Sequence, residues 1–204
     1  MAAGEYSDQK FRLLAALLTF LILAGVTVAV AWLVLRPSKP HFVLQNVVVF
    51  DLNLTAGDSV TANFQVTVAS RNPNGRIAVN YDRLVAGAAY RGQQITLPTR
   101  LPATYQAGKE TIVWSPFLYG PQIPVAPYVG VSLRQDQIAG TVLVTVRVGG
   151  GIRWKVGTVV SWKYRLTVNC PVYLNFPARK NGSGVAVGTA TFQNHLILDC
   201  HVDV

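Results

Sequence analysis

The chain has 204 residues, of which half are hydrophobic and only 13% are charged, and it carries a net charge of +9. This length allows one folded domain and a short extra segment, and the low charged share excludes a disordered chain. Lysine and arginine are scattered rather than gathered in a stripe with aromatics. That pattern predicts no nucleic-acid partner and favours acidic polysaccharide, anionic lipid or acidic proteins, with a basic surface that has no single partner as the alternative.

The first predicted element is a transmembrane helix over residues 13–35, behind a short tail of residues 1–12. The stretch holds no charged residue, and a helix of 23 residues spans roughly 35 Å, enough to cross a hydrocarbon core of about 30 Å. Trp32 lies near its C-terminal end, where interfacial indoles are common. A cleaved signal peptide is the alternative, but its apolar part usually runs for only about 7–15 residues before a site of small residues.

Charge does not orient this helix, because basic residues flank it equally on both sides. Two glycosylation sequons follow it, at Asn53 and Asn181, and so do the only two cysteines, Cys170 and Cys200. Sequons and paired cysteines are typical of chains that face an oxidising, extracytoplasmic compartment. We therefore expect a cytosolic tail, an extracytoplasmic domain, N-glycans at both asparagines and a disulfide between the cysteines. Two buried free thiols are the alternative interpretation of the cysteines.

Residues 36–41 predict a short stiff stalk, because a helix cannot continue through their two prolines. Residues 42–204 predict one antiparallel β-sandwich with one short helix. The clearest strand covers residues 60–70, where apolar and polar side chains alternate as in a half-buried strand. Further strands are predicted over residues 42–50, 77–81, 84–91, 94–97, 111–114, 141–148, 152–160, 164–169 and 189–198.

Three segments between these strands carry other signals. Residues 115–127 hold four prolines and predict irregular structure. Apolar residues four apart predict a helix over residues 125–137, which Gly140 ends. The three consecutive glycines at residues 149–151 predict a hairpin turn.

The sequence offers little for catalysis, and we expect neither an enzyme nor a bound cofactor or metal. It lacks the motifs of serine hydrolases, zinc proteases and phosphate-binding loops. His195 and His201 lie near Cys200, but a zinc site needs three or four ligands, and the other cysteine is 30 residues away. These histidines are therefore expected on the surface or on a strand face.

Asn72-Pro73-Asn74, followed by Gly75 and Arg76, breaks the chain between two strands. Asn, Pro and Gly in this order are typical of a tight turn. The last three residues, Asn-Gly-Arg, could alternatively serve as an adhesion tripeptide. We favour the turn.

Arg153-Trp154-Lys155-Val156-Gly157 places cations and apolar residues alternately along a predicted strand. With a period of two, Trp154 shares the core face with Val156, and Arg153 and Lys155 point outward. The functional alternative is a basic strand face that contacts acidic lipid or wall polymer.

The motifs of the chain, taken together, resemble one known family. They are Asn72-Pro73-Asn74, Arg76-Ile77 with Tyr81-Asp82, Tyr105-Gln106 with Gly108-Lys109, Gly150-Gly151-Ile152 running into Arg153-Trp154-Lys155-Val156-Gly157, and the two late cysteines. With the apolar run ahead of them, they are similar to plant harpin-induced-like proteins of the non-race-specific disease resistance group, which carry the late embryogenesis abundant group-two domain. The resemblance extends from about residue 10 to residue 200.

The resemblance implies a plasma-membrane protein whose domain lies outside the cell and which takes part in defence against pathogens and in abiotic stress. It also implies a β-sandwich of fibronectin-like or immunoglobulin-like outline and no enzymatic activity. The expected role is that of a non-catalytic interaction module for a cell-wall polymer, a lipid or another membrane protein. Protection during dehydration, or binding of a lipid or another apolar ligand, are the alternatives.

Overall fold

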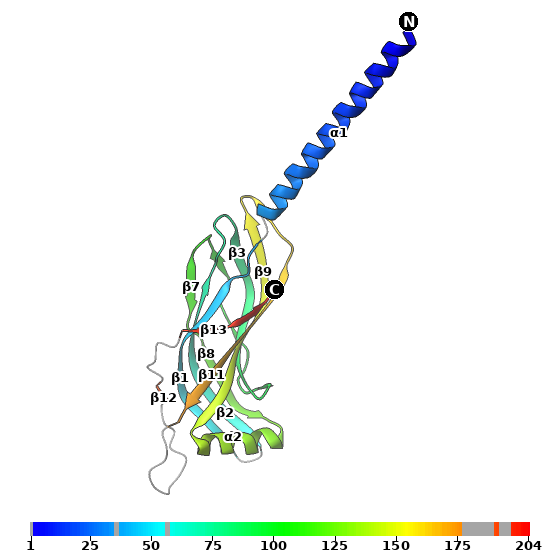
Figure 1. The fold of residues 1–204 in the computed structure, drawn as a ribbon. Coiled ribbons are helices and arrows are strands. Elements are labelled where there is room, and N and C mark those ends of the chain that lie inside the picture. Colours follow the sequence, from blue (N-terminus) through cyan, green and yellow to red (C-terminus); the bar gives the residue numbers. More distant parts are fainter. Residues whose placement is uncertain (1, 35–36, 56–57, 177–189, 192–196) are drawn as a thin grey trace. The chain divides into compact units, whose positions relative to one another are not determined.

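The structure is a computed structural model, and it describes residues 2–34, 37–55, 58–176, 190–191 and 197–204 (Figure 1). The chain divides into two compact units, Met1–Pro37 and Ser38–Val204. The first unit contains the helix α1 (Ala2–Val34), and the second contains all of the described strands and the helix α2 (Pro127–Ala139). Each unit is compact by itself.

The helix α1 is unbroken from Ala2 to Val34. Its side chains are described at residue 12 and over residues 14–29. Within this described part, no helical stretch is both long enough and apolar enough to cross a membrane.

The second unit is built from two antiparallel sheets, as the sequence predicts. The first sheet contains β1 (His41–Thr55), β2 (Ser59–Arg71), β7 (Thr111–Trp114), β8 (Phe117–Pro124), β12 (Ala190–Thr191) and β13 (Leu198–Asp199). The second contains β3 (Ala78–Tyr90), β4 (Gln93–Gln94), β5 (Thr99–Arg100), β6 (Thr104–Gln106), β9 (Thr141–Val156), β10 (Val159–Val160), β11 (Tyr164–Asn175) and β14 (His201–Asp203). The core lies between the sheets and takes buried apolar residues from both.

Alternation along β2 positions the first sheet on this core. Val60, Phe64 and Val66 are buried, whereas the polar side chains between them are half-buried. A strand with one apolar and one polar face packs only its apolar face inward, so the observed burial follows from the alternation. The prediction for residues 60–70 is confirmed and extends by one residue at each end.

The predicted helix is also confirmed, as α2. Pro127 begins it, since a proline at the first helical position loses no hydrogen bond. Val129 and Leu133 are fully buried on one face, and Gly140 ends the helix with a φ of 86°. This left-handed conformation is one that glycine adopts readily.

The prediction of a hairpin turn at residues 149–151 is wrong, because β9 runs through these glycines without a break. A Cβ atom on Gly150 would lie 2.7 Å from the backbone oxygen of Arg83, at a point where the pairing of β3 with β9 is irregular. Glycine is needed there for close approach of two strands and not for a turn. The hairpin turn comes later, at Gly157, with a φ of 58°.

Other strand boundaries differ from the prediction in ways that pairing explains. Residues 115–127 contain β8, which pairs with β2 along the first sheet; two of its prolines fall within an outer strand, where a missing N–H is tolerated. Residues 77–81 and 84–91 form one strand, β3, that continues through a local irregularity. The predicted strand at residues 189–198 lies largely outside the described residues.

Candidate functional site at the stalk end of the domain

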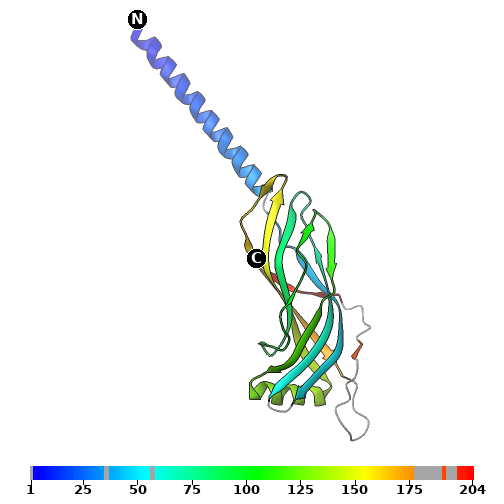
Figure 2. The ribbon, with the colours of Figure 1, turned by 180° about the vertical axis from the view of Figure 1, so that it is seen from behind.

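One end of the domain, here termed the stalk end, is where residues 38–40 lead into β1. The turn at residues 72–77 lies there, and β3 begins beyond it by pairing Ala78 with Lys155, next to the β9–β10 hairpin. Figures 1 and 2 show the tips of β3 and β9 at this end and α2 across the opposite end. Both motifs singled out in the sequence therefore lie at the stalk end.

Asn72 is the centre of the turn and is fully buried. Its side-chain amide donates hydrogen bonds to the backbone oxygens of Ile77 at 2.7 Å and Ala107 at 3.0 Å. Its side-chain oxygen accepts from both the backbone N–H and the side-chain amide of Asn74, at 3.0 and 2.9 Å. One side chain thus holds two turns together, which confirms the prediction of a tight turn.

Asn74 fastens the stalk to this turn. Its side-chain amide donates to the backbone oxygen of Ser38 at 2.9 Å, and the backbone N–H of Ser38 donates to its side-chain oxygen, also at 2.9 Å. The side chain is therefore occupied on both polar atoms. An adhesion tripeptide would need it free, so the structure favours the turn over the tripeptide.

Behind the turn, Tyr81 centres a buried network that the sequence did not reveal. Its hydroxyl donates to the side-chain oxygen of Gln106 at 2.7 Å and lies 2.9 Å from the hydroxyl of Ser70. The amide of Gln106 in turn donates to the backbone oxygen of Ser70 at 2.7 Å. Burial raises the pKa of the Tyr81 hydroxyl well above its ordinary value. The phenol is thus protonated at neutral pH and acts as a fixed donor.

The polar atoms of this network are bonded to one another inside the domain. In the described part of the chain, every buried side-chain nitrogen or oxygen has a hydrogen-bond partner. Among the same residues, His, Cys, Asp and Glu nowhere form a group of three that could hold a metal. The arrangement can fix the stalk and its turns in place, and the groups left to meet a partner are those on the surface.

Residues 153–156 of the strand motif lie in β9 as predicted, with Trp154 buried, and Gly157 falls in the turn that follows. A nitrogen of Arg153 lies 3.7 Å from a carboxylate oxygen of Asp82. The ammonium group of Lys155 lies 5.6 Å from the ring centre of Tyr105. Both cations face outward from the core.

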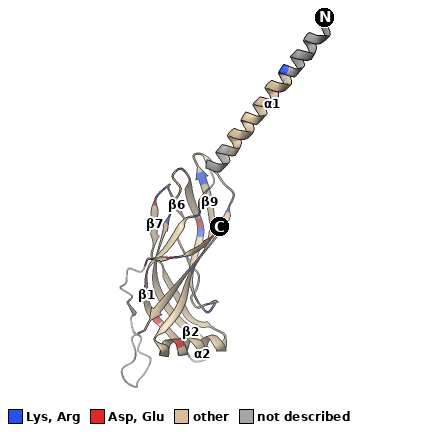
Figure 3. Cartoon of the chain, viewed as in Figure 1, with Lys and Arg blue, Asp and Glu red and all other residues tan. Residues whose placement is uncertain are grey.

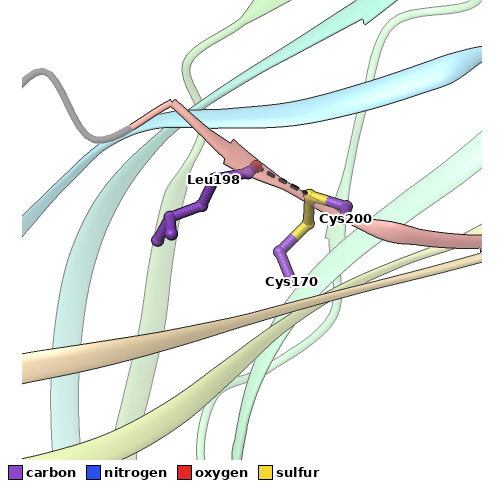
Figure 4. Close-up of a disulfide and its surroundings, with 3 residues drawn as sticks. All are labelled: Cys170, Leu198 and Cys200. Carbon is purple, nitrogen blue, oxygen red and sulfur yellow. Dashed lines mark hydrogen bonds between the residues drawn. A yellow bond between two sulfur atoms is a disulfide. The ribbon is translucent and has the colours of Figure 1, made fainter.

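The predicted disulfide between Cys170 and Cys200 is confirmed, and free thiols are excluded (Figure 4). The two Cα atoms are 4.4 Å apart. Cys200 follows β13, which pairs with β1 in the first sheet, and precedes β14, which pairs with β11 in the second. The bond therefore fixes the residue at which the chain passes from one sheet to the other.

The strand that pairs with β11 beside this bond comes after Cys200 in the chain. It consists of His201–Asp203. In addition, the backbone N–H of Cys200 donates to the oxygen of Phe42 at 2.9 Å. One residue is thus tied to both sheets, covalently to one and by a hydrogen bond to the other.

Of the two sequons, only Asn53 falls within the described residues; Asn181 lies outside them. Asn53 is half-buried on β1 opposite Thr61, and its amide donates to a carboxylate oxygen of Asp51 at 2.6 Å. It lies twelve residues beyond His41, so at about 3.3 Å per residue it is some 40 Å from the stalk end. Glycosylation at either asparagine stays a prediction.

A small pocket lies on β3 and β9, lined by Gly87, Ala89, Arg147 and their neighbours. Its volume is about 120 Å³. Pockets for drug-sized ligands are roughly 300–1,000 Å³, so this one is too small for a lipid chain.

The most exposed large hydrophobic side chain on the described surface of the domain was not anticipated. Trp162 is 88% exposed, in the bend between β10 and β11. A signal was present in the sequence, since residues 153–165 carry four cations and no acid. The pattern alone could not separate this tryptophan from Trp154, which is buried eight residues earlier.

The chain is similar to known proteins along most of its length. The profile of the late embryogenesis abundant protein family LEA_2 matches residues 67–170. NDR1/HIN1-like protein 1 of Arabidopsis thaliana is 44% identical over 195 residues, which cover 95% of this chain and 92% of that protein. NDR1/HIN1-like protein 12 of the same plant is 44% identical over 193 residues, covering 95% and 91%. The solution structure of AT1g01470 from Arabidopsis thaliana aligns with 72% of this chain and 87% of its own, at 15% identity and a TM-score of 0.42.

Proposed function

This chain belongs to the NDR1/HIN1-like family of plant proteins with a late embryogenesis abundant domain, and from that membership we propose its function. It is a defence and stress-response protein of the plasma membrane, anchored by one transmembrane helix over residues 13–35. Its β-sandwich lies outside the cell and acts as a non-catalytic interaction module.

The observation that carries the anchor is the uncharged apolar run inside an unbroken helix. Residues 13–35 contain no charged side chain, and α1 is continuous through Val34. Large apolar side chains such as Leu14, Phe20 and Leu23 are more than half exposed along it. Exposure of this kind is unfavourable in water and favourable in lipid, where the backbone must also be helical.

The disulfide supports a domain outside the cytosol. Disulfides form and persist in oxidising compartments and are rare in the cytosol. Cys170 and Cys200 are bonded, and both follow the proposed anchor. This order predicts a cytosolic N-terminus and an external C-terminus.

The interaction role is supported by what the motif residues do. Asn72, Asn74 and Gln106 use their polar atoms in internal hydrogen bonds, so none of them is free to act on a substrate. Cations such as Arg71 and Arg76 are exposed at the same end. A domain with a satisfied interior and a basic surface is suited to binding rather than to chemistry.

Membrane extraction and protease protection test the anchor and its orientation. Wild-type protein in plant membranes should resist alkaline carbonate, and protease added to intact protoplasts should remove an epitope after Val204 but spare one before Met1. Leu18→Arg with Leu21→Arg should release the protein into the carbonate supernatant, because charges at the centre of a span are costly. Leu18→Ala with Leu21→Ala is the matched control and should remain in the pellet. Release of the wild type, or loss of the N-terminal epitope alone, would contradict the proposal.

Co-purification tests the interaction role. The chain, with and without an elicitor treatment of the plant, should retain proteins or polymers that a control chain does not. The control keeps residues 1–37 and carries an unrelated β-sandwich in place of residues 38–204. Identical captured material from both chains would refute a role for the domain in binding.

A further inference from the structure

Trp162 is held in place by its backbone while its ring stays exposed. Ser161 donates its N–H to the oxygen of Trp154 at 2.8 Å, and its hydroxyl accepts from the N–H of Trp154 at 2.9 Å. The same hydroxyl donates to the backbone oxygen of Trp162 at 2.8 Å. A rigid bend therefore presents an indole that is 88% exposed, at little further cost in conformational entropy when it is buried by a partner.

Other exposed apolar side chains surround this bend. Val159 is 71% exposed, and Val160 and Tyr164 are each nearly half exposed. Together with Trp162 they form what we term the Trp162 corner, residues 159–164 at the stalk end. Isolated apolar side chains on a surface are ordinary, but a cluster with a tryptophan marks a contact surface.

Cations border the Trp162 corner. Arg153, Lys155, Lys163 and Arg165 belong to the same stretch of chain, which contains no acid. Asp82 is the carboxylate beside them, and Arg153 and Lys163 share it at 3.7 and 3.8 Å. One negative charge against these cations leaves the border basic.

Charge is unequal along the domain, as Figure 3 shows with blue near the tip of β9 and red on β1 and α2. The end near α2 carries charges of both signs: Asp51 late in β1, Asp58 in the turn that follows, and Asp136 on α2, with exposed Arg134 on the same helix and a nitrogen of Arg91 3.6 Å from Asp136. At the stalk end, Lys39 is paired with Asp203, whereas Arg71 and Arg76 are exposed and have no ion-pair partner among the described residues. An anionic surface would therefore attract the stalk end more strongly than the end near α2.

The chain is too short to keep the stalk end away from the membrane. Arg36 and Pro37 are the only residues between the proposed span, which ends at residue 35, and Ser38 of the domain. Three peptide steps cover at most about 11 Å when fully extended. This reach is comparable with the Debye length of about 8–10 Å at ordinary salt, so cations at the stalk end lie within the partly screened range of the lipid charge.

We propose that the Trp162 corner docks on anionic lipid head groups of the same membrane that holds the chain. The ring of Trp162 enters the interfacial layer, and Lys155 and Lys163 contact the head groups. An amphipathic indole with neighbouring cations suits this layer, where tryptophan is enriched. This inference rests on the proposed membrane anchor, and it fixes which face of the domain a cell-wall or protein partner can reach.

Full-length protein in lipid nanodiscs provides the test, with brominated lipids that quench nearby tryptophan. Trp32 lies within the proposed span and Trp162 in the corner, while Trp114 and Trp154 are buried in the domain. In discs that contain phosphatidylserine, Trp162→Phe should lose a distinct quenched component relative to wild type. The quenching that remains in Trp162→Phe reports Trp32 and hence the anchor.

The charge dependence has its own variants. Lys155→Gln with Lys163→Gln should lower the ratio of docked to undocked domain by about fivefold for each charge. The matched control, Arg100→Gln with Arg134→Gln, removes two exposed charges outside the stalk end and should leave the quenching unchanged. Discs of phosphatidylcholine alone, or 1 M salt, should reduce the Trp162 component as the lysine variant does.

The outcomes separate the two proposals. Quenching of Trp32 with equal quenching of wild type and Trp162→Phe would overturn the docking and leave the anchor standing. Loss of the Trp32 component would overturn the anchor itself. A Trp162 component that is the same in neutral and anionic discs would refute recognition of anionic lipid. Quenching of Trp162 that appears only after a cell-wall polymer or a protein is added would also refute it.

Discussion

Gly108 lies directly against Gly75: a Cβ atom on Gly108 would stand 2.4 Å from the carbonyl oxygen of Gly75. It would also stand 2.9 Å from the carbonyl oxygen of Asn74. The next residue, Lys109, donates its N–H to that same oxygen of Asn74 at 2.9 Å. The turn at residues 107–110 can therefore reach the Asn72–Asn74 turn only if glycine is at position 108.

Gly108→Ala should destabilise the domain by about 1–3 kcal/mol, because backbone atoms must move to admit the methyl group. Gly75→Ala is the matched control. Its Cβ would meet only the end of the Lys109 side chain, at 3.9 Å, so its cost should be within about 0.5 kcal/mol. Denaturant unfolding of the protein in detergent, followed by tryptophan fluorescence, gives both values. Equal stability of the two variants would show that the turns can separate without loss.

The glycines of β9 allow a second matched comparison. Gly150→Ala would place a methyl group 2.7 Å from the oxygen of Arg83 and 2.8 Å from a methyl of Leu84. Gly149→Ala would meet the oxygen of Leu166 at 3.7 Å, an ordinary contact. We expect Gly150→Ala to cost about 1–3 kcal/mol and Gly149→Ala less than about 1 kcal/mol. If Gly149→Ala proved the costlier change in denaturant unfolding, the close approach of β3 would not be what requires glycine.

Tyr81 gives a pH-dependent prediction. Removing its hydroxyl in Tyr81→Phe leaves buried polar atoms of Gln106 and Ser70 without their partner and should cost about 1–3 kcal/mol at pH 8. The pKa of Tyr81 is raised in the folded protein, whereas in the unfolded chain it is about 10. Above pH 10 the unfolded state therefore binds fewer protons than the folded state, and the stability of the wild type falls as pH rises.

The Tyr81→Phe variant lacks this contribution, so its deficit relative to wild type should shrink between about pH 10 and pH 11. Unfolding midpoints measured across this range provide the check. Tyr128→Phe, which removes an exposed hydroxyl on α2, is the control and should follow the wild type. A Tyr81→Phe deficit that stays constant with pH would mean that the raised pKa does not contribute.

The disulfide predicts how the stability costs of two single variants and their double variant compare. Cys170→Ser and Cys200→Ser should each cost about 2–5 kcal/mol, because the unfolded chain regains the freedom of a closed loop. The double variant should cost little more than either single one, since all three lose the same bond. Unfolding under non-reducing conditions measures these values. A double variant that loses the sum of the two single costs would mean that each cysteine contributes independent packing.

Much of this fold follows from patterns local in sequence. The alternation of apolar and polar residues in β2 predicts which face of the strand is buried, and so does the spacing of apolar residues four apart in α2. Both predictions hold because each element packs against the core on one face. The family resemblance carried by Asn72-Pro73-Asn74 and residues 153–157 is likewise confirmed by the relatives. Local patterns succeed where one face of an element meets the core.

The incorrect predictions concern residues whose local structure is determined by a contact far away in the sequence. The prolines of β8 are tolerated because the strand has an outer position beside β2. The sequence of residues 115–127 does not indicate that position. Glycine is needed at position 150 because the backbone oxygen of Arg83, which is far away in the sequence, lies against it. Ser38 as the partner of Asn74 was invisible for the same reason. The exposure of Trp162 depends on a bend set by Ser161, so composition alone could not identify the corner.

The path of mechanical load through the domain follows from how its two ends meet. The ammonium group of Lys39 lies 3.3 Å from the oxygen of Val202 and 3.8 Å from the carboxylate of Asp203. Tension between the stalk and the C-terminus would first part this contact and then unzip β14 from β11. Peeling would stop at Cys200, because its bond to Cys170 passes the load into β11, which is paired along its length with β9. Under oxidising conditions a pull on the C-terminus therefore releases only the last few residues, and under reducing conditions it can strip β13 from β1 as well.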